Sequence, residues 1–263
     1  MADQASPVLF DLDDGVARLR FNRPENLNAL DQSTAEAFAD AVTQILADKR
    51  VRVIVISGEG RAFAAGGDLA AFRASDDRAG LAEAVIRPFH SVLEALGDAP
   101  QAVICMLHGS VAGAGMSIAA MADLAIAAED ASFTMAYSKV GVPPDCGGSW
   151  ALPRLVGLRR ALELALLSPV IDAAEACRIG LVNRVVPRAS LEEETMAVAR
   201  RLAASAPLAM GWTKALMRQA FTTDLASQLA AEQAAFKACA GTDDFNEALE
   251  AFFGKRRPVF TGN

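Results

Sequence analysis

The chain has 263 residues, enough for one large domain or for a core with an appended piece. Hydrophobic residues make up 52% and charged residues 22%, a balance that argues against a disordered chain. The net charge of −7 gives no electrostatic basis for binding nucleic acid or an anionic membrane.

Targeting and metal signals are weak along the chain. The four cysteines form no Cys-x-x-Cys pair and there are two histidines, so no metal site is expected. The acidic N-terminus does not resemble a signal peptide. The longest apolar tract, near residues 110–128, is interrupted by Gly113, Gly115 and Asp123, so no membrane span is predicted. Isolated thiols favour a reducing compartment, and we expect a cytoplasmic protein.

The first 190 residues alternate strand patterns with helix patterns. Residues 16–21 alternate apolar and basic side chains, as a half-buried strand does. The other predicted strands are nearly all apolar, which is typical of buried parallel strands. They are expected at 51–57, 102–108, 124–128 and 182–187, with helices at 33–48, 81–97 and 116–121. This order predicts an α/β fold of βαβ units with right-handed crossovers.

The composition changes after about residue 190, where helical spacing replaces strand patterns. Four amphipathic segments follow, at 191–205, 208–221, 225–239 and 244–253. Pro207 separates the first two segments, and Gly241 with Thr242 separates the last two. The predicted division is an α/β core over residues 1–195 and a C-terminal helical region over residues 196–263.

Two glycine-rich segments each follow a predicted buried strand. In residues 57–72, Gly66 and Gly67 permit a positive φ and a close approach of the backbone to a ligand. In residues 107–123, small side chains lead into a helix whose first N–H groups favour negative charge. If the two strands are neighbours, these amides can stabilise one developing oxyanion. The alternatives are a plain turn and tight helix–sheet packing.

Four sequence blocks carry a resemblance to a known family. They read RPENLNAL (23–30), GRAFAAGGDL (60–69), HGSVAGAGMSIAAMADLAIA (108–127) and KVGVPPDCGGSWALPRLVG (139–157). In this order they resemble the crotonase, or enoyl-CoA hydratase/isomerase, superfamily. The resemblance implies a spiral of ββα units, a homotrimer or dimer of trimers, and an acyl-CoA thioester substrate. It implies no separate cofactor, because coenzyme A enters as part of that substrate.

The resemblance also implies roles for single residues. The oxyanion donors would be the N–H groups of Gly67 and Ala114. The family usually has glycine where Ala114 stands, but an N–H group is present with either residue. The CoA arm would be bordered by Asn28, Ala29, Leu30, Ala65 and Asp68.

The family's hydratases carry two glutamates, and this chain has Ser117 and Tyr137 in their places. Hydration needs a base for water and an acid for the carbon, which serine and tyrosine supply poorly. Asp145 stands where several isomerases of the family carry an aspartate. The segment PDCGGSWALPRLVG and the ending FTGN most resemble the 1,2-epoxyphenylacetyl-CoA isomerases of phenylacetate breakdown. We therefore expect an isomerase that shifts a double bond, or opens a ring epoxide, through an enolate, with Asp145 as the base.

Several alternatives stay open at this point. Asp145 could instead cap the following helix, and Tyr137 could be a pocket wall before a hydrogen-bond donor. If Asp145 is the base, an apolar wall of Val140, Val142, Pro143 and Trp150 is expected around it. Other possible functions are a hydratase with an unrecognised acid and a silent acyl-CoA binder. A 4-chlorobenzoyl-CoA dehalogenase-like hydrolase would use His90 together with Asp145.

Overall fold

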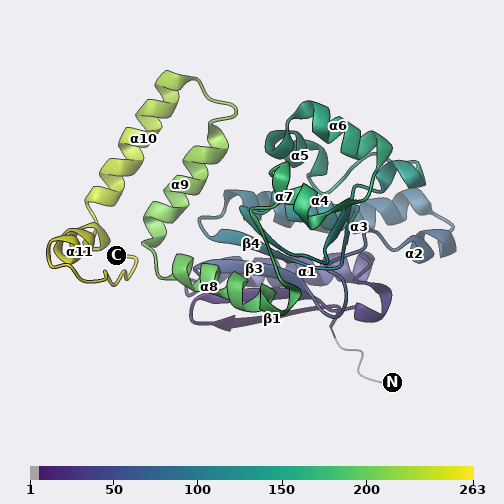
Figure 1. The fold of residues 1–263 in the computed structure, drawn as a ribbon, viewed down its shortest axis with the longest axis horizontal. Coiled ribbons are helices and arrows are strands. Elements are labelled where there is room, and N and C mark those ends of the chain that lie inside the picture. The colour runs from purple at the N-terminus through teal and green to yellow at the C-terminus, as the bar shows by residue number, and fades with distance from the viewer. Residues whose placement is uncertain (1–5) are drawn as a thin grey trace.

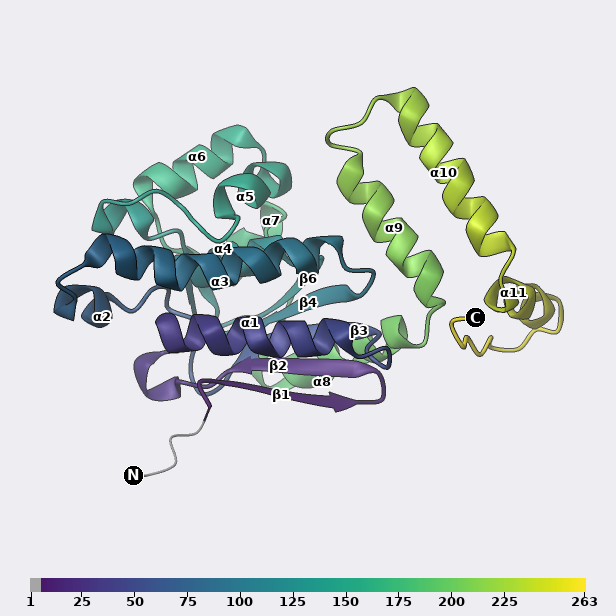
Figure 2. The same cartoon turned by 180° about the vertical axis from the view of Figure 1, so that it is seen from behind.

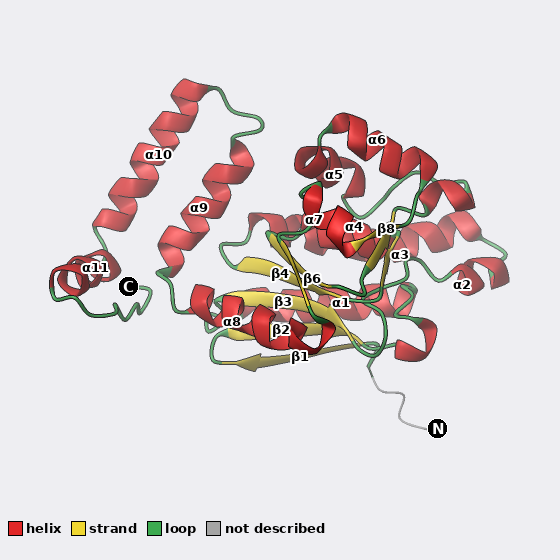
Figure 3. Cartoon of the chain, in the orientation of Figure 1, coloured by secondary structure: helices red, strands yellow, loops and turns green. Residues whose placement is uncertain are grey.

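A six-stranded sheet forms the centre of the computed structural model, which describes residues 6–263 (Figure 3). Its strand order is β1-β2-β3-β4-β6-β9. The strands are β1 (Val8–Asp13), β2 (Val16–Phe21), β3 (Val53–Gly58), β4 (Ala102–Leu107), β6 (Leu124–Ala128) and β9 (Arg184–Val186). β1 and β2 form an antiparallel hairpin, and all other pairs in this sheet are parallel. All five strands expected from the sequence are confirmed.

A second, three-stranded sheet lies beyond the ends of the first. It contains β5 (Ser110–Ala112), β7 (Ser132–Thr134) and β8 (Ile171–Asp172), and a bridge between Ala64 and Val111 extends it. The chain therefore passes from β4 to β5 to helix α4 (Ala114–Met121), and then from β6 to β7. After the β1–β2 hairpin, these turns use one strand of each sheet before a helix. This is the spiral of ββα units that the resemblance implied.

Helices cover both faces of the large sheet. Helices α1 (Gln32–Ala47) and α3 (Arg78–Asp98) lie side by side on one face, and α8 (Leu191–Ala203) lies on the other (Figures 1 and 2). Phe38 of α1 stacks on Phe21 with ring centroids 5.3 Å apart, and it lies 5.2 Å from Phe89 of α3. These aromatic contacts lie in the main apolar core, which joins α1 and α3 to the sheet.

Shorter helices lie in the connections between these elements, and the sequence patterns did not predict most of them. They are η1 (Pro24–Asn26), α2 (Leu69–Ala74), η2 (Tyr137–Val140), α5 (Gly148–Val156), α6 (Leu158–Leu167), α7 (Ala173–Arg178) and η3 (Arg188–Ser190). Most of them have six residues or fewer, which is too short to show an apolar period, whereas α5 and α6 are amphipathic and were missed. The helices expected at 33–48, 81–97 and 116–121 are confirmed as α1, α3 and α4.

All four expected tail helices are present: α8, α9 (Pro207–Gln219), α10 (Leu225–Ala240) and α11 (Asp243–Phe253). The predicted boundary after residue 195 falls inside α8, whose Leu191 and Ala199 are buried with the sheet. The helices that stand to one side of the core are α9 to α11 (Figures 1 and 2). They expose large apolar side chains, among them Met217, Phe221, Phe236, Phe252 and Phe253. None of the helices in the described chain has both the length and the apolarity needed to cross a bilayer.

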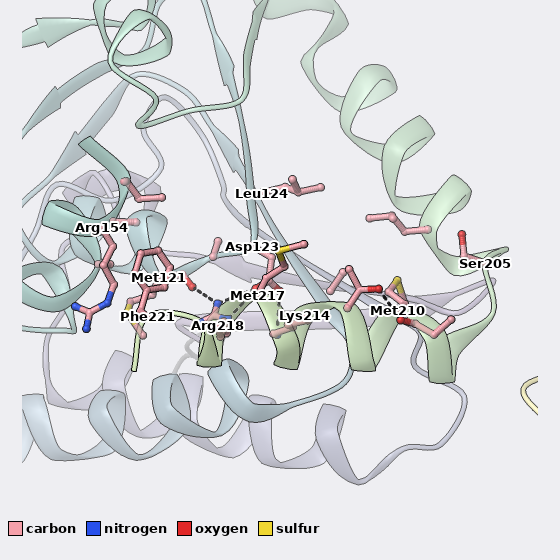
Figure 4. A pocket seen from close by; sticks show the side chains of 18 of the residues that line it. Met121, Asp123, Leu124, Arg154, Ser205, Met210, Lys214, Met217, Arg218 and Phe221 are labelled. Carbon is pink, nitrogen blue, oxygen red and sulfur yellow. Dashed lines mark hydrogen bonds and ion pairs between the residues drawn. The ribbon is translucent and has the colours of Figure 1, made fainter. Parts of the chain in front are cut away.

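A buried ion cluster joins α9 to the core. Asp123, just before β6, pairs with Lys214 at 2.9 Å and with Arg218 at 2.7 Å (Figure 4). The Lys214 side chain is only 8% exposed, and its ammonium also donates to the carbonyls of Leu96 and Gln101. Burial lowers the pKa of Lys214, and the charge of Asp123 opposes that shift. Asp123 therefore fixes where α9 leaves the core.

We expect Asp123→Asn to reduce the free energy of unfolding by about 3 kcal/mol, because a buried ammonium loses its counter-charge. Urea unfolding measures this change, and hydrogen exchange should show the largest loss of protection in α9. The control is Asp130→Asn, because Asp130 and Arg188 form an exposed pair 3.7 Å apart. That change should cost less than about 0.5 kcal/mol. Equal stability of the two variants would contradict the anchoring role.

Candidate functional site

The segment around residues 27–30 holds the first glycine corner in place. The N–H of Leu30 donates to the carbonyl of Gly66 at 2.8 Å, and the N–H of Ala65 donates to Leu27 at 3.0 Å. The N–H of Asp68 donates back to the carbonyl of Leu30 at 2.9 Å. Leu30 and Ala65, both predicted substrate-binding residues, thus fix the backbone on each side of Gly66.

Asn28 supports the same corner from beneath. Its side chain is buried, accepts from the N–H of Arg23 at 2.8 Å and donates to the carbonyls of Ala62 and Glu59 at 2.8 and 3.0 Å. Its φ of 55° lies in the left-handed region, which asparagine tolerates better than most residues. Asn28 therefore shapes the loop through main-chain contacts, and its contact with a ligand stays a prediction.

The second corner packs directly against the first. A Cβ atom added to Gly66, whose φ is +97°, would lie 3.2 Å from the carbonyl oxygen of Ala112. A Cβ atom added to Gly113, whose φ is +52°, would lie 3.4 Å from the Cα of Gly66. The positive φ at both positions favours glycine, and the close approaches leave little room for a larger residue. They place Gly67 and Ala114, the next residue at each corner, in adjacent loops.

The amides of Gly67 and Ala114 are available to a ligand. Ala114 is the first residue of α4, which has no capping side chain at its start. Within residues 6–263, neither of these two N–H groups donates a hydrogen bond. The dipole of α4 adds to the preference for negative charge at the Ala114 end. This corner can therefore stabilise an anionic oxygen.

A cavity of about 330 Å³ lies beside the first corner. Ala29 and Asp68 line it, as the predicted border of a CoA arm requires. The Asp68 carboxylate accepts from the N–H groups of Ala70 and Ala71 at the start of α2, and it pairs with Arg23 at 3.2 Å. Asp68 is thus held at the rim by its own helix. Its role toward a ligand stays a prediction.

Asp145 is hydrogen-bonded to Tyr137, which is in turn hydrogen-bonded to Ser117; these two residues stand at the positions that the resemblance assigns to the hydratase glutamates. The hydroxyl of Tyr137 donates to Oδ1 of Asp145. The same hydroxyl lies 3.1 Å from the hydroxyl of Ser117, which is fully buried on α4 three residues after Ala114. A chain of polar groups therefore runs from Asp145 to the helix that begins with the Ala114 amide.

The first turn of α5 brings Asp145 to this position. A Cβ atom on Gly148 would lie 2.3 Å from the Ser117 hydroxyl, and one on Gly147 would lie 2.6 Å from the sulfur of Met121. Only glycine lets α5 approach α4 this closely. The residue that caps α5 is Gly147, and no side chain accepts from its first N–H groups. The alternative in which Asp145 caps this helix is therefore excluded.

Burial raises the pKa of Tyr137 far above its usual value, and the charge of Asp145 raises it further. Tyr137 therefore keeps its proton and acts as a donor. Burial followed by the charge of Asp145 also raises the pKa of the Cys146 thiol. That thiol stays protonated, and a protonated thiol is a poor nucleophile.

A cavity of about 730 Å³ opens in front of Asp145. His90 and Glu94 of α3 line one side, and Lys214 and Arg218 of α9 line another. His90 therefore shares a cavity with Asp145. Within residues 6–263, no cluster of three or more His, Cys, Asp or Glu side chains is placed to bind a metal ion.

Within residues 6–263, the expected apolar wall around Asp145 is formed only in part. Val140 and Val142 are 48% and 50% exposed, Pro143 is also exposed, and none of the three lines the cavity at Asp145. Trp150 does line that cavity, although it is 43% exposed. The Tyr137 ring and the Cys146 thiol are the buried groups next to the carboxylate.

A second cavity, also of about 730 Å³, lies on the far side of the ion cluster between α5, α8 and α9 (Figure 4). Its lining is mainly apolar and includes Leu124, Met210 and Phe221. The two large cavities share four lining residues: Met121, Trp150, Lys214 and Arg218. The wall between them therefore rests on the Asp123 cluster.

Comparison with known proteins agrees with this geometry. The model of the enoyl-CoA hydratase/isomerase family matches residues 11–263. The chain belongs to the enoyl-CoA hydratase/isomerase family. This enzyme is 35% identical to the 1,2-epoxyphenylacetyl-CoA isomerase of Escherichia coli, over 97% of this chain and 98% of that protein. It is also 35% identical to the crotonyl-CoA hydratase of Syntrophomonas wolfei, over 96% and 97%.

The fold comparison gives the same family. The crystal structure of an enoyl-CoA hydratase from Bacillus anthracis matches this enoyl-CoA hydratase/isomerase family member with a TM-score of 0.93 at 31% identity. The match covers 98% of this chain and 100% of that one. The crotonase-like fold expected from the sequence is therefore confirmed. Relatives of similar identity carry both hydratase and isomerase names.

Sequence reasoning missed the contact that joins Tyr137, Ser117 and Asp145. From the sequence, Tyr137 was expected first as a pocket wall, and Ser117 was given no role beyond standing at a glutamate position. The signal was present, because the chain's one tyrosine lies eight residues before Asp145 at a position where hydratases carry an acid. The direction of the phenol depends on η2, which the sequence pattern did not predict.

Gly66→Ala should lower the free energy of unfolding by about 2 kcal/mol, because a side chain at this φ is strained and meets the Ala112 carbonyl. Gly67→Ala is the matched control. A Cβ atom there would meet only the Phe72 ring, at 3.8 Å. Its cost should stay within about 0.5 kcal/mol. Urea unfolding compares the two variants, and equal losses would contradict the close packing of the two corners.

Proposed function

We propose that this enzyme is an acyl-CoA isomerase that moves a double bond by shifting one proton, with Asp145 as the base. One observation carries this proposal. The positions of both hydratase glutamates are occupied by hydroxyl side chains, Ser117 and Tyr137, that form a hydrogen-bonded group with the Asp145 carboxylate. In place of two glutamates that activate water, this chain has two hydroxyl groups that hold a single carboxylate, Asp145. A single base suffices for a 1,3-proton shift, whereas hydration needs two groups.

The proposed reaction has two steps. Asp145 takes a proton from C2 of a 3-enoyl thioester, and the electrons of that C–H bond move onto the thioester oxygen. The amides of Gly67 and Ala114 stabilise this enolate oxygen. Asp145 then returns the proton to C4, the double bond forms between C2 and C3, and the thioester carbonyl is restored. The carboxylate ends as it began, so the enzyme needs no separate cofactor.

The cavity in front of Asp145, with about 730 Å³, supports a bulky acyl group. Similarity to a 1,2-epoxyphenylacetyl-CoA isomerase supports a ring-bearing thioester, in which the same carboxylate would assist the opening of a ring epoxide. The CoA arm would follow Ala29 and Asp68 beside the first corner. The exposed apolar faces of α9 to α11 support assembly into trimers.

One observation favours a second candidate. His90 and Asp145 line the same cavity, as a 4-chlorobenzoyl-CoA dehalogenase-like hydrolase would require. In that reaction Asp145 attacks the ring carbon and releases halide, and His90 then activates water to hydrolyse the aryl ester. Halide release from 4-chlorobenzoyl-CoA is the assay that separates this hydrolase from an isomerase.

Asp145→Asn keeps the shape of the side chain and removes the base, so we expect turnover to fall by about 1000-fold. The assay follows conversion of a 3-enoyl-CoA into its conjugated 2-enoyl isomer by absorbance. Binding of acetyl-CoA, measured by calorimetry, should be nearly unchanged. Asp130→Asn, an exposed acid outside the cavities, is the control and should keep full activity. Full activity in Asp145→Asn, or faster hydration of crotonyl-CoA than isomerisation, would reject the proposal.

Ala114→Pro removes one oxyanion donor and little else, because proline is tolerated at the first position of a helix. Turnover should fall by about 100- to 1000-fold while the circular dichroism spectrum stays unchanged. Gln32→Pro is the matched control, since Gln32 is the exposed first residue of α1. It should retain normal turnover. A fully active Ala114→Pro enzyme would exclude this amide from the mechanism.

A further inference from the structure

We infer that Tyr137, seated by Ser117, is a positioning residue that holds one oxygen of Asp145 and leaves the other oxygen to carry the proton. This inference rests on the proposed function. In this view Tyr137 and Ser117 together determine the orientation of the Asp145 carboxylate. The argument uses the contacts of the phenol, its protonation and the local backbone of Asp145.

The phenol of Tyr137 has a fixed place in the core. Tyr137 begins η2, is 8% exposed, and its hydroxyl lies between Ser117 on α4 and Asp145 before α5. The Ser117 hydroxyl is itself confined, because the backbone of Gly148 packs against it. The phenol therefore points at the carboxylate from a site with little freedom to move.

The backbone alone does not fix the carboxylate. Pro143 and Pro144 stiffen the chain before Asp145, and Cys146 and Gly147 follow with φ of 48° and 77°. These features set the Cα position, but a carboxylate can still rotate about its side-chain bonds. The Tyr137 hydroxyl is the group that selects one rotation, by donating to Oδ1.

In the hydrogen bond between Tyr137 and Asp145, the phenol is always the donor and Oδ1 is always the acceptor. Its phenol keeps its proton, because burial and the neighbouring charge raise its pKa. Oδ1 is therefore a constant acceptor through the reaction. Within residues 6–263, the other side-chain donor beside the carboxylate is the Cys146 thiol, a weak donor, and no N–H or O–H group donates to Oδ2. Oδ2 is thus the oxygen that can take the proton from C2 and return it at C4, from one place in the cavity.

The first test is Tyr137→Phe, which keeps the ring and removes the donor. We expect kcat for the 3-enoyl-CoA to fall by about 10- to 100-fold, because a misplaced base loses its alignment with the substrate. The KM should change little, since the phenol contacts the base and not the thioester. A residue that only forms the pocket wall would instead change KM.

Two serine variants test the seating of the phenol. Ser117→Ala should lower kcat by about threefold to tenfold, the effect of losing one hydrogen bond. Ser138→Ala is the control, because Ser138 follows Tyr137 on η2 but bonds the hydroxyl of Ser168 at 2.8 Å. It should leave kcat unchanged. The melting temperatures of Tyr137→Phe, Ser117→Ala and Ser138→Ala check that each variant remains folded.

The pH dependence of kcat/KM gives a readout that a purely structural role would not change. Tyr137→Phe removes a hydrogen bond to the base, so its pH profile should differ from that of the wild-type enzyme. Ser138→Ala should keep the wild-type profile. The other titratable groups around Asp145 are common to every variant: Cys146 beside it, His90, Glu94 and Asp98 of α3, and Lys214 and Arg218 of α9.

The decisive comparison adds Tyr137→Phe to Asp145→Asn. If Tyr137 acts through Asp145, the double variant has the same residual rate as Asp145→Asn alone. A further loss in the double variant would overturn the inference, because Tyr137 would then act on the substrate directly. Wild-type kcat in Tyr137→Phe, with Asp145→Asn inactive, would also overturn it and leave the proposed function intact. An active Asp145→Asn enzyme would reject the proposed function itself.

Discussion

The site depends on the close approach of α5 to α4. No side chain fits at Gly148, because a Cβ atom there would overlap the Ser117 hydroxyl. This contact sets the position of the loop before α5, and therefore of Asp145. It also confines Ser117, which in turn meets the Tyr137 phenol. One glycine contact thus links the helix that begins at Ala114 to the carboxylate that faces the cavity.

The spiral gives the site its other half. Two successive ββα turns end in neighbouring loops, and Gly66 and Gly113 let these loops touch. The large sheet supplies the rigid base, and the segment around Leu30 holds the first loop by main-chain hydrogen bonds. The amides of Gly67 and Ala114 are proposed to act on the thioester oxygen, and Asp145 is proposed to act on the carbon chain. All three belong to short segments that are held by contacts with the rest of the core.

The sequence predicted the elements whose physical signal is strong. Buried parallel strands such as β3 and long amphipathic helices such as α1 have clear periods, and all of these were confirmed. The two-residue strand β8 and the turn η2 have no such period, since tertiary contacts determine them. The four blocks led to Gly67, Ala114 and Asp145 as candidate site residues, and their roles stay predictions. The Tyr137–Asp145 bond depends on tertiary contacts that no sequence pattern shows.

The wall between the two large cavities has a consequence for how this enzyme can change. Met121, Trp150, Lys214 and Arg218 line both spaces, so a substitution elsewhere in the apolar cavity can shift side chains that also border the cavity at Asp145. The shape of the space in front of the carboxylate can therefore change through residues that do not contact Asp145.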